Sequence, residues 1–400
     1  MAMKRGSYRT GRERVERILD ASHELFVQAG YRATSLRDIA AASGISHPAL
    51  LRHFGSKEEI LTALVERIDR RHGNWLENGV DDGGPRVSVV AAARRNEAEA
   101  GWIPLFTALL GEATSPEHPG HELMRTRRRL GSRLGVRLLG GQGGDERSVK
   151  LAVQRLGAVW DGLQILSLYF PGRIDIPGRL ADFEDDLRAN GIPPAPPAPV
   201  RGPDASPGGE ATGEAAAGPE PTPRARAFES AARLYAAHGY YGTSMQAVAD
   251  GAGLTKAALV HIAPTKRALL DLVVAELTAP APDEADPGSR LKALLDRPRW
   301  QSAAEMVLMC EATVPSHPAH ALMAGRLEYS LSSTVRDLAS AGSPAEEGER
   351  QAAAQWLVAL ALGALIAWLY EPGDVELGTL IEEAVPPRPR ARVACEAPAG

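Results

Sequence analysis

The chain has little of what several classes of protein depend on. Its 400 residues include only two cysteines, Cys310 and Cys395, which excludes a disulfide framework and a zinc site of four thiolates. The longest apolar run, residues 356–370, has 15 members, fewer than the roughly 20 that cross a bilayer. The opening residues lack the apolar core of a signal peptide. We therefore expect a cytoplasmic protein without a membrane-spanning segment.

Charge of one sign and catalytic patterns are also scarce. Lys and Arg number 45 and Asp and Glu 50, a net charge of −5, which excludes a uniformly basic nucleic-acid coat but not a local basic patch. No phosphate-binding glycine loop, dinucleotide fingerprint or Ser/His/Asp order occurs, so we predict neither an enzyme nor a cofactor. Segments 112–121 and 311–320 each hold a Glu and two His three residues apart, which could bind a metal. We favour a loop-to-helix junction and predict no metal.

Proline and glycine, by contrast, are abundant, at 30 and 40 residues. Ten of the prolines lie within residues 189–223, where there is no aromatic side chain. Such a segment cannot build a core and is typical of an extended linker with a reach of roughly 30 Å or more. It divides the chain into two halves of similar length.

The two halves repeat one another. Residues 18–65 align without a gap with residues 227–274 and are identical at 12 of 48 positions. Two further blocks match in the same order: EATSPEHPGHELM (112–124) with EATVPSHPAHALM (311–323), and GLQILSLYFPG (162–172) with GALIAWLYEPG (363–373). Shared Ala-rich composition does not explain the ungapped Gly and Lys spacing, so the sequence indicates a tandem duplication.

Apolar periodicity and capping signals predict four helices near the amino terminus, over residues 12–29, 36–42, 47–54 and 57–68. Ser35 and Asp38 form a capping box before the second helix, and Ser46 is a favourable N-cap for the third. Gly44 between them suits a tight turn. Two short helices around a Gly-containing turn are the arrangement of a helix-turn-helix DNA reader, whose second helix fits the major groove.

The charge of this region agrees with DNA binding. Residues 1–62 contain ten Lys and Arg against seven Asp and Glu, so a basic region lies within an acidic chain. Its leading arm carries five cations, Lys4, Arg5, Arg9, Arg12 and Arg14. They could follow the DNA backbone or enter a minor groove; alternatively, the arm is a solubilising tail.

Residues 26–61 read F-x3-GYRATSLRDIAAASGIS-x4-LRHFGSKEEIL. This pattern resembles the amino-terminal domain of the tetracycline-repressor (TetR) family of transcription regulators. The resemblance implies a recognition helix over residues 46–53, although Leu51 stands where the family usually has Tyr. The DNA contacts that it implies are Thr34 and Lys57 on phosphates, His47, Arg52 and His53 toward the groove, and also Ser35 and Ser46.

The second half keeps part of this pattern. The DNA contacts implied there are Thr243, Thr255, Lys256, His261 and Lys266. It departs at the end of the recognition helix, where Ala263 and Pro264 replace Phe54 and Gly55 of the first copy. Two alternatives stay open: a reader that is weaker or suited to a different half-site, and a DNA-silent domain kept as a packing partner.

The rest of each half reads as helices broken by Gly/Pro loops, so we predict an all-α fold. The predicted domains are helix-turn-helix domains at 1–70 and 224–278, helical ligand-binding and dimerisation domains at 86–188 and 287–385, the linker at 189–223 and a disordered tail at 386–400. In the family that the sequence resembles, the last two long helices dimerise; here they are about 145–170 with 177–188, and 345–370 with 374–384. Duplication then implies an intrachain pseudo-dimer that acts as a monomer.

Aromatic and Met side chains of the helical domains are candidates for an effector pocket, although each could be ordinary core. They are Trp102, Phe106, Met124, Trp160 and Tyr169 in the first half, and Trp300, Met306, Met309, Met323, Trp356 and Trp368 in the second. The sequence favours a ligand-responsive repressor that binds double-stranded operator DNA with two non-identical half-sites and responds to an unknown small-molecule effector. The alternative is a small-molecule-sensing or partner-binding helical protein with weak or no specific DNA binding.

Overall fold

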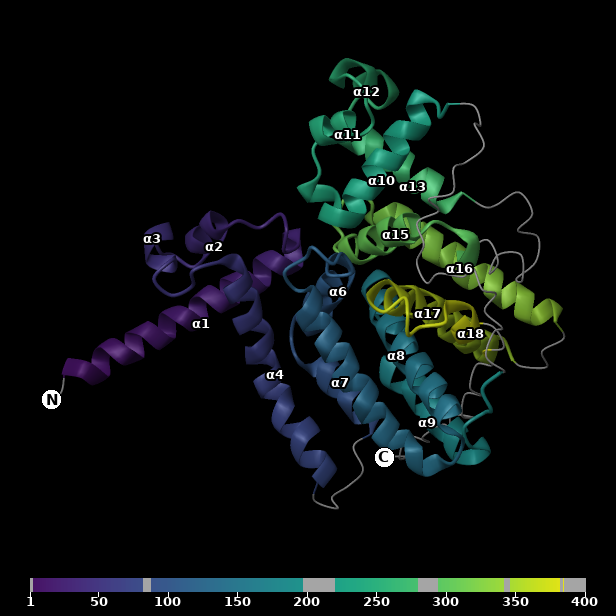
Figure 1. Cartoon of the computed structure of the whole chain (residues 1–400). Coiled ribbons are helices and arrows are strands. Elements are labelled where there is room, and N and C mark those ends of the chain that lie inside the picture. The colour runs from purple at the N-terminus through teal and green to yellow at the C-terminus, as the bar shows by residue number, and fades with distance from the viewer. Residues whose placement is uncertain are drawn as a thin grey trace, which may run out of the picture.

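The computed structural model of the chain describes residues 3–81, 88–196, 220–279, 294–341, 346–381 and 384. Every regular element within these ranges is helical, which confirms the all-α prediction (Figure 1). The first half contains α1 (Met3–Ala29), α2 (Leu36–Ala42), α3 (His47–Leu50), α4 (Lys57–Asp81), α5 (Val89–Ala98), α6 (Trp102–Glu112), α7 (His121–Leu139), η1 (Gly140–Gln142), α8 (Glu146–Tyr169) and α9 (Ile176–Asn190). The second half contains α10 (Pro223–Gly242), α11 (Met245–Gly251), α12 (Lys256–Ile262), α13 (Lys266–Thr278), α15 (Arg299–Glu311), α16 (His320–Ser340), α17 (Glu347–Tyr370) and α18 (Leu377–Ile381).

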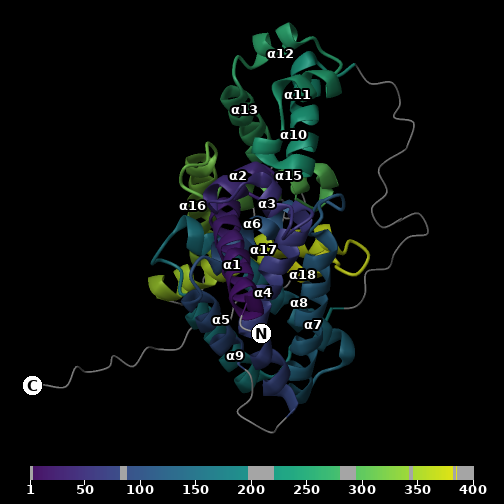
Figure 2. The ribbon, with the colours of Figure 1, turned by 90° about the vertical axis from the view of Figure 1, so that its left-hand side faces the viewer.

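Two small helical units project from a larger body of helices (Figures 1 and 2). We call α1–α4 reader one and α10–α13 reader two. Reader one extends to the left in Figure 1 and reader two to the top. Helices α5–α9 form body one and α15–α18 form body two, and the two bodies pack against each other.

Local sequence signals determine the turns of reader one. The Ser35 Oγ accepts from the Asp38 N–H at 3.2 Å, and the Asp38 carboxylate accepts from the Ser35 N–H at 2.8 Å, which completes the predicted capping box. Gly30 and Gly44 have φ angles of +83° and +67°, a left-handed conformation that other residues rarely adopt. The predicted stop of the first helix and the predicted turn before α3 are therefore confirmed.

The two halves meet where α8 crosses α17 at small residues. A Cβ atom added to Gly162 would overlap the carbonyl oxygen of Ala359, and one added to Gly363 would overlap that of Ala158. Gly162 and Gly363 are equivalent in the repeat, and so are Ala158 and Ala359. The crossing is thus the same contact made twice, as in a two-fold symmetric dimer. The contact expected between residues 145–170 and 345–370 is present.

Tyrosines repeat this symmetry beside the crossing. The Tyr169 hydroxyl donates to the Met309 carbonyl oxygen at 2.7 Å, across the boundary between the halves. Its equivalent, Tyr370, donates to the Leu110 carbonyl oxygen at 3.0 Å in the opposite direction. Both hydroxyls are buried, so these bonds satisfy groups that would otherwise lose their hydration.

Helix α17 passes the length and composition test for a membrane span. It has 24 residues and a mean hydropathy of 1.9 in its most apolar window, yet 72% of that window is buried inside the protein. Its neighbours are mainly α8 and α16. A helix that is apolar on every face is expected where two halves enclose it, so this helix is core.

Three boundaries differ from the predictions. The leading arm is helical, since α1 begins at Met3. Helix α4 continues to Asp81, beyond the predicted domain end at residue 70. The predicted linker starts within body one, because α9 continues to Asn190 and the Ala195 N–H donates to the Ser148 hydroxyl at 2.8 Å. Residues 197–219 of the linker and the predicted tail lie outside the described residues.

Candidate nucleic-acid interface

The reading surface of reader one consists of α3 and the turn that follows it. Helix α3 has only four residues, and the chain then turns through residues 51–53. The N–H groups of His53 and Phe54 donate to the Leu50 carbonyl oxygen at 2.8 and 3.0 Å and close this turn. The predicted helix over 47–54 is therefore too long at its carboxyl end.

Several predicted DNA contacts reach the surface of this segment. Ser46 and Arg52 are exposed, while His47 and His53 are half-buried. Leu51 between them is 42% exposed, and an aliphatic group so placed can contact a thymine methyl. Ser35 is exposed at the start of α2 but uses its hydroxyl in the capping box. Ser35, Ser46, His47, Arg52 and His53 stay predicted DNA contacts.

Thr34 and Lys57, predicted to contact phosphates, have internal partners instead. Thr34 is buried, and its hydroxyl donates to the Gly30 carbonyl oxygen at 2.8 Å. The Lys57 ammonium donates to the carbonyl oxygens of Tyr31, Arg32 and Thr34 at 2.8, 3.4 and 2.8 Å. Burial also lowers the pKa of Lys57. In this structure both side chains hold the turn between α1 and α2, and their contacts with phosphates stay predictions.

Reader two builds the same kind of surface from other side chains. Helix α12 has seven residues, and the Thr255 hydroxyl caps it by accepting from the Ala258 N–H at 3.1 Å. Lys256 and His261 are exposed, and Val260 is 41% exposed at the position of Leu51. The predicted DNA residues Thr255, Lys256 and His261 are therefore all at the surface.

Thr243 and Lys266, the equivalents of Thr34 and Lys57, also have internal partners in reader two, but with fewer hydrogen bonds. Thr243 is buried and donates to the Gly239 carbonyl oxygen at 2.9 Å. Lys266 donates to the Tyr241 carbonyl oxygen at 3.3 Å and lies 4.5 Å from the centre of the Tyr240 ring. Lys57 thus has three carbonyl partners and Lys266 has one.

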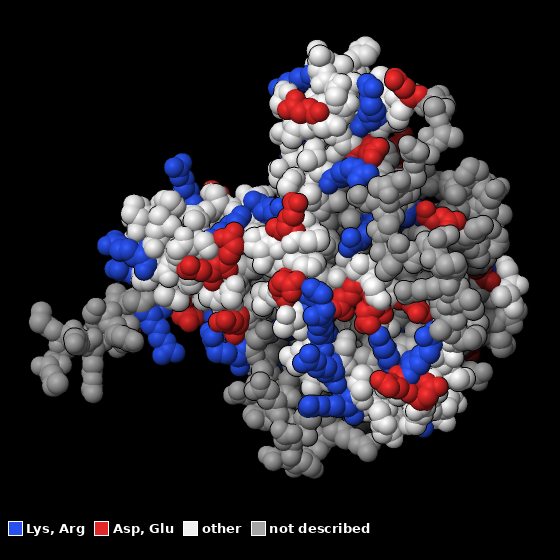
Figure 3. Space-filling view, in the orientation of Figure 1, with Lys and Arg blue, Asp and Glu red and all other residues white. Residues whose placement is uncertain are grey.

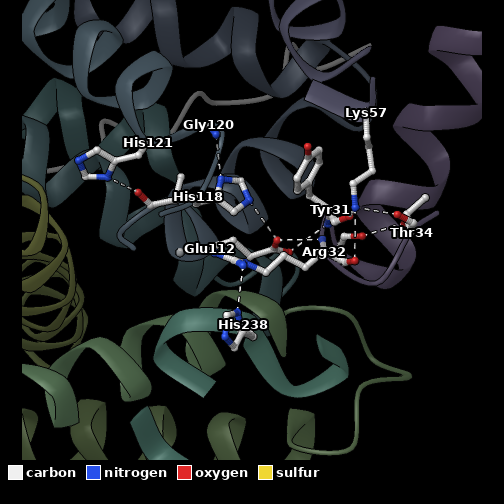
Figure 4. Close-up of polar contacts among 12 residues, drawn as sticks. Tyr31, Arg32, Thr34, Lys57, Glu112, His118, Gly120, His121 and His238 are labelled. Carbon is white, nitrogen blue, oxygen red and sulfur yellow. Dashed lines mark hydrogen bonds and ion pairs between the residues drawn. The ribbon is translucent and has the colours of Figure 1, made fainter. Parts of the chain in front are cut away.

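A buried carboxylate, which the sequence analysis considered only as a possible metal ligand, joins reader one to body one (Figure 4). Glu112, at the end of α6, accepts from the N–H groups of Tyr31 and Arg32 at 3.0 and 3.2 Å. A Cβ atom at Gly30 would lie 2.5 Å from this carboxylate. The His118 Nε2 lies 3.5 Å from Glu112 on its other side. One side chain therefore connects the turn of reader one with the segment that leads into α7.

The second half has the equivalent junction at Glu311, where burial shifts the pKa values of the carboxyl and of the neighbouring histidine. Glu311 accepts from the N–H groups of Tyr240 and Tyr241 at 2.8 and 3.4 Å, and His317 Nε2 lies 3.8 Å away. Burial raises the pKa of Glu311 to about 7 and lowers that of His317 to about 4. Near neutral pH, the carboxyl is partly protonated and the imidazole is uncharged.

The second histidine of each segment points toward the opposite half. His121 and His320 each donate from Nδ1 to a backbone carbonyl oxygen at 2.8 Å. Their rings stack on Tyr370 and Tyr169, with centroids 5.4 and 5.2 Å apart. Within the described residues, no group of three or more His, Cys, Asp or Glu is placed to hold a metal. Both segments form loop-to-helix junctions that also link reader, body and interface.

The readers also touch each other directly. The Arg32 guanidinium donates from Nη1 to Nδ1 of His238 at 3.2 Å (Figure 4). Arg32 belongs to the turn that Glu112 holds, and His238 lies on α10 of reader two. A rotation of one reader therefore affects the contact with the other.

On the side of the molecule that Figure 3 shows, Lys and Arg side chains are mixed with acidic ones. Figure 3 shows them over both readers, interspersed with acidic groups, and in a denser run over α7 of body one. The exposed Lys and Arg side chains of the two candidate DNA-contacting segments are Arg52, in the turn after α3, and Lys256, at the start of α12. Few charges thus serve the candidate surface, so base contacts would carry much of any DNA preference.

The predicted effector-pocket residues fill the core or its margin. Trp102, Met124, Tyr169, Met306, Met309, Met323 and Trp356 are buried, whereas Phe106, Trp160, Trp300 and Trp368 are half-buried. Two surface hollows of about 410 and 470 Å³ lie elsewhere, one beside His53 and α4, the other between α16, α17 and Arg173. The effector contacts stay predictions.

Comparison with known proteins bears on both readers. A family model for bacterial regulatory proteins of the tetR family matches residues 18–64 and again residues 228–273. Similar proteins include the HTH-type transcriptional repressor Rv3405c of Mycobacterium tuberculosis, 37% identical over 97 residues, the HTH-type transcriptional activator FasR of Mycolicibacterium smegmatis, 39% over 77, and the HTH-type transcriptional repressor KstR2 of Rhodococcus jostii, 39% over 68.

These alignments are partial. They cover 19%, 19% and 16% of this chain and 52%, 33% and 33% of the three relatives. The chain therefore matches about half of the first relative's length and a third of the others'. Because the family model matches both readers and each has helix-turn-helix geometry, both readers belong to the amino-terminal domain of the tetR family of bacterial regulatory proteins, which occurs twice in tandem in this chain.

Proposed function

We propose that this DNA-binding regulator acts as a single chain in the cytoplasm, with one reader on each of two unlike half-sites of one operator. The observation that supports this most directly is the different surface of the two readers on a symmetric body. At equivalent positions, His47 corresponds to Lys256 and Arg52 to His261. Different side chains at groove-facing positions prefer different bases.

The expected half-sites follow from the chemistry of these side chains. A guanidinium such as that of Arg52 binds the O6 and N7 atoms of guanine with two hydrogen bonds. His261 offers a single imidazole at the same place, and Lys256 adds a cation at the start of α12. We propose a stronger guanine preference under reader one than under reader two.

The covalent link replaces the association of two chains. Where ordinary dimeric readers depend on a second chain, the segment 197–219 keeps the halves at an effective concentration of up to about millimolar. The repeated contacts of Gly162 with Ala359 and Gly363 with Ala158 support such a pseudo-dimer. We therefore propose that the chain functions as a monomer.

The buried carboxylates provide a route from an effector to the readers. Glu112 ends α6 and holds two N–H groups of the reader-one turn, and Glu311 ends α15 and does the same for reader two. A ligand that displaces α6 or α15 must move or break these bonds. Because a reader pair fits DNA at one spacing only, a small rotation at either junction changes affinity.

Body one is the half that we propose to bind the effector. Thr107 on α6 and Gln164 on α8 are buried, and the Thr107 hydroxyl and the Gln164 amide oxygen have no hydrogen-bond partner among the described residues. Their equivalents in body two are Met306 and Leu365. Polar groups kept in a core favour a ligand with complementary polar atoms. The same helices carry the predicted pocket residues Trp102, Phe106 and Trp160.

A selection of bound sequences from a random duplex pool tests the proposal. The intact chain should enrich a site made of two different half-sites about one helical turn apart. Enrichment of a true palindrome would contradict unlike readers. The absence of any enriched sequence, with normal folding, would favour the alternative, a small-molecule-sensing or partner-binding helical protein without specific DNA binding.

The proposed binding of an effector by body one is tested separately. Thr107→Met and Gln164→Leu copy the residues of body two and should leave DNA affinity unchanged while they reduce the response to a compound that dissociates the wild type. A compound library screened by fluorescence anisotropy of the bound operator supplies that compound. Met306→Thr in body two is the matched control and should leave the response intact.

A further inference from the structure

Among the described residues, five ion pairs join the two halves at the rim of their interface, and in each of these the cation comes from the first half. They are Arg129 with Glu371 at 2.6 Å, Arg125 with Glu371 at 3.7 Å, Arg147 with Glu376 at 3.2 Å, Lys150 with Asp374 at 2.5 Å and Arg173 with Glu328 at 2.7 Å. The rim of body one is therefore basic at these places, and the facing rim of body two is acidic.

Two contacts at the centre of the interface are shared by the halves. Gly162 and Gly363 make the same crossing contact, and Tyr169 and Tyr370 make the same hydrogen bond. Two copies of either half would present these groups to each other equally well. These contacts do not distinguish the halves, but one neighbouring position does: a Cβ atom at Gly111 would lie 2.4 Å from the Cβ of Cys310, its equivalent in the repeat. The centre therefore disfavours pairing of two second halves, whereas it leaves pairing of two first halves open.

At the rim, two positions of the repeat have opposite charge. Arg129 on α7 is equivalent to Glu328 on α16, and Arg173 is equivalent to Asp374. In the observed pairing, Arg173 faces Glu328 and Lys150 faces Asp374. Each reversed position thus meets a group of the opposite sign.

Pairing of two first halves would put like charges together at these positions. With Arg129 in the place of Glu328, Arg173 would face Arg129. With Arg173 of the second copy in the place of Asp374, this arginine would face Lys150 of the first copy. Only the pair at Arg147 would survive, since Asp175 is the equivalent of Glu376.

Pairing of two second halves would be unfavourable for the same reason. Glu328, in the place of Arg129, would face Glu371. It would also face Asp374, in the place of Arg173. Each Glu328 would then have two carboxylates of the other copy opposite it, Glu371 and Asp374.

We propose that this rim selects the partner: the surface of body one accepts the acidic-rimmed body two and rejects a second copy of itself. The proposal rests on the pseudo-dimer proposed above. The paired side chains are partly exposed, for example 55% for Arg173 and 46% for Glu328, so each pair adds little affinity. Selectivity arises because the wrong pairing brings like charges together, and discrimination depends on that difference.

Exchange of halves between chains tests the selection directly. A protease site is inserted into segment 197–219 of the full chain, and one of two preparations carries an affinity tag at its amino terminus. After cleavage and mixing at about 0.15 M salt, the tagged first half is captured and its partners are weighed by mass spectrometry. We expect second halves in at least tenfold excess over untagged first halves. Comparable recovery of untagged first halves would overturn the proposal.

A variant of the same chain should reverse the selection. With Arg129→Glu and Arg173→Glu, the tagged first half carries the acidic rim and should now capture the untagged wild-type first half. Failure to do so, when the variant is folded by circular dichroism, also counts against the proposal. The matched control is Arg188→Glu, because among the described residues the ion pairs of Arg188 are with Glu184 and Asp185 of its own helix, and it should not change the partner.

A charge-exchange cycle in the uncleaved chain covers the case in which cleaved halves fail to exchange. Arg173→Glu and Glu328→Arg should each lower the melting temperature, and the double variant should recover most of the loss. Strictly additive losses would overturn the proposal. The DNA selection is independent of both tests. If the halves pair without preference but the chain still enriches an asymmetric DNA site, only the rim proposal is contradicted. If the halves pair selectively but no asymmetric DNA site is enriched, the proposed function is contradicted.

Discussion

Reader one and reader two have the same backbone plan but different surfaces. Gly30 and Gly239, with φ of +83° and +67°, each lie against a buried carboxylate. On the reading helices, by contrast, Arg52 corresponds to His261 and His47 to Lys256. Buried positions are held by turn geometry and by a partner in the body, whereas an exposed position can change without any cost to the fold.

The two bodies, unlike the readers, share contacts at the surface where they meet and differ in their buried side chains. The glycine crossing and the tyrosine hydrogen bonds occur in both, yet body one buries Thr107, Asp161 and Gln164 where body two has Met306, Leu362 and Leu365. Asp161 is paired with Arg128, and burial raises the pKa of this carboxyl. The shared centre of the interface therefore joins two bodies whose buried polar groups lie at different positions, since body two in turn buries Glu305 where body one has Phe106.

The largest effect is expected from breaking the symmetric crossing. Gly162→Val and Gly363→Val should each lower the free energy of unfolding by about 3 kcal/mol or more, since overpacking against a backbone carbonyl has no flexible neighbour to relieve it. Urea unfolding measures the loss. Gly157→Ala, on an exposed face of α8 with nothing within 4 Å, is the control and should be neutral or stabilising by up to about 1 kcal/mol.

If only one of the two glycine variants is destabilised, the crossing is not the two-fold contact described here. Equal losses, with the control unchanged, would sharpen the comparison of the bodies by showing that their shared centre supports both halves alike.

The next effect concerns the pH dependence of the second junction. Glu311 has a folded-state pKa of about 7 against an ordinary 4.5, so its stabilising contribution is complete below pH 4.5 and is lost as pH rises to 7. Glu311→Gln removes this loss. The variant should gain stability relative to the wild type between pH 4.5 and 7, by up to about 3 kcal/mol at 1.36 kcal/mol per pKa unit. Urea unfolding across pH 4–8 measures it.

His317 supplies the matched control with the opposite sign. Its folded-state pKa of about 4 against 6.5 means that its contribution is complete above pH 6.5 and is lost as pH falls to 4. His317→Asn should therefore gain stability relative to the wild type on acidification. Parallel pH profiles for both variants and the wild type would show that the junction does not titrate as described.

DNA readout should separate the readers by a somewhat smaller amount. Arg52→Ala should weaken binding by about 2 kcal/mol at a guanine-containing half-site and relax its preference there. His261→Ala should affect only the other half-site, and less. Binding to operator variants with each half-site altered in turn distinguishes them. Equal weakening on every sequence would assign Arg52 to the phosphates instead.

The smallest difference is expected between the two internal lysines. Lys57→Met removes three hydrogen bonds to carbonyl oxygens and should destabilise reader one by about 1.5 kcal/mol, while Lys266→Met removes one and should cost about 0.5 kcal/mol. Amide hydrogen exchange at residues 31–34 and 240–243 reports each turn locally. If Lys57→Met instead flattens the salt dependence of DNA binding without faster exchange, Lys57 does contact phosphate.

The positions of the turns and helices in the readers were largely predictable. The capping box at Ser35, the left-handed Gly30 and Gly44 and the repeat itself are signals that act within a few residues, so they are visible without the fold. Helix α3 was predicted too long, because nothing local to residues 47–54 shows that the chain turns after Leu50.

The candidate site was predictable only in part. Thr34 and Lys57 were assigned to phosphates by their place in the motif, but the partners that occupy them lie in the folded turn. Glu112 and Glu311 belong to the best-matched block of the repeat. That match indicated that both carboxylates have the same role in their halves. Their role depends on the end of α6 or α15 reaching a turn some 70 to 80 residues away in sequence.

By itself, the sequence determined the all-helical class, the duplication and the two helix-turn-helix units, because periodicity, caps and glycine positions are properties of short segments. Only the tertiary structure decided which side chains face solvent, which carboxylates brace the readers and which charges meet across the two halves. Those outcomes depend on distances between segments far apart in the chain, and burial and electrostatic interaction are set by such distances alone.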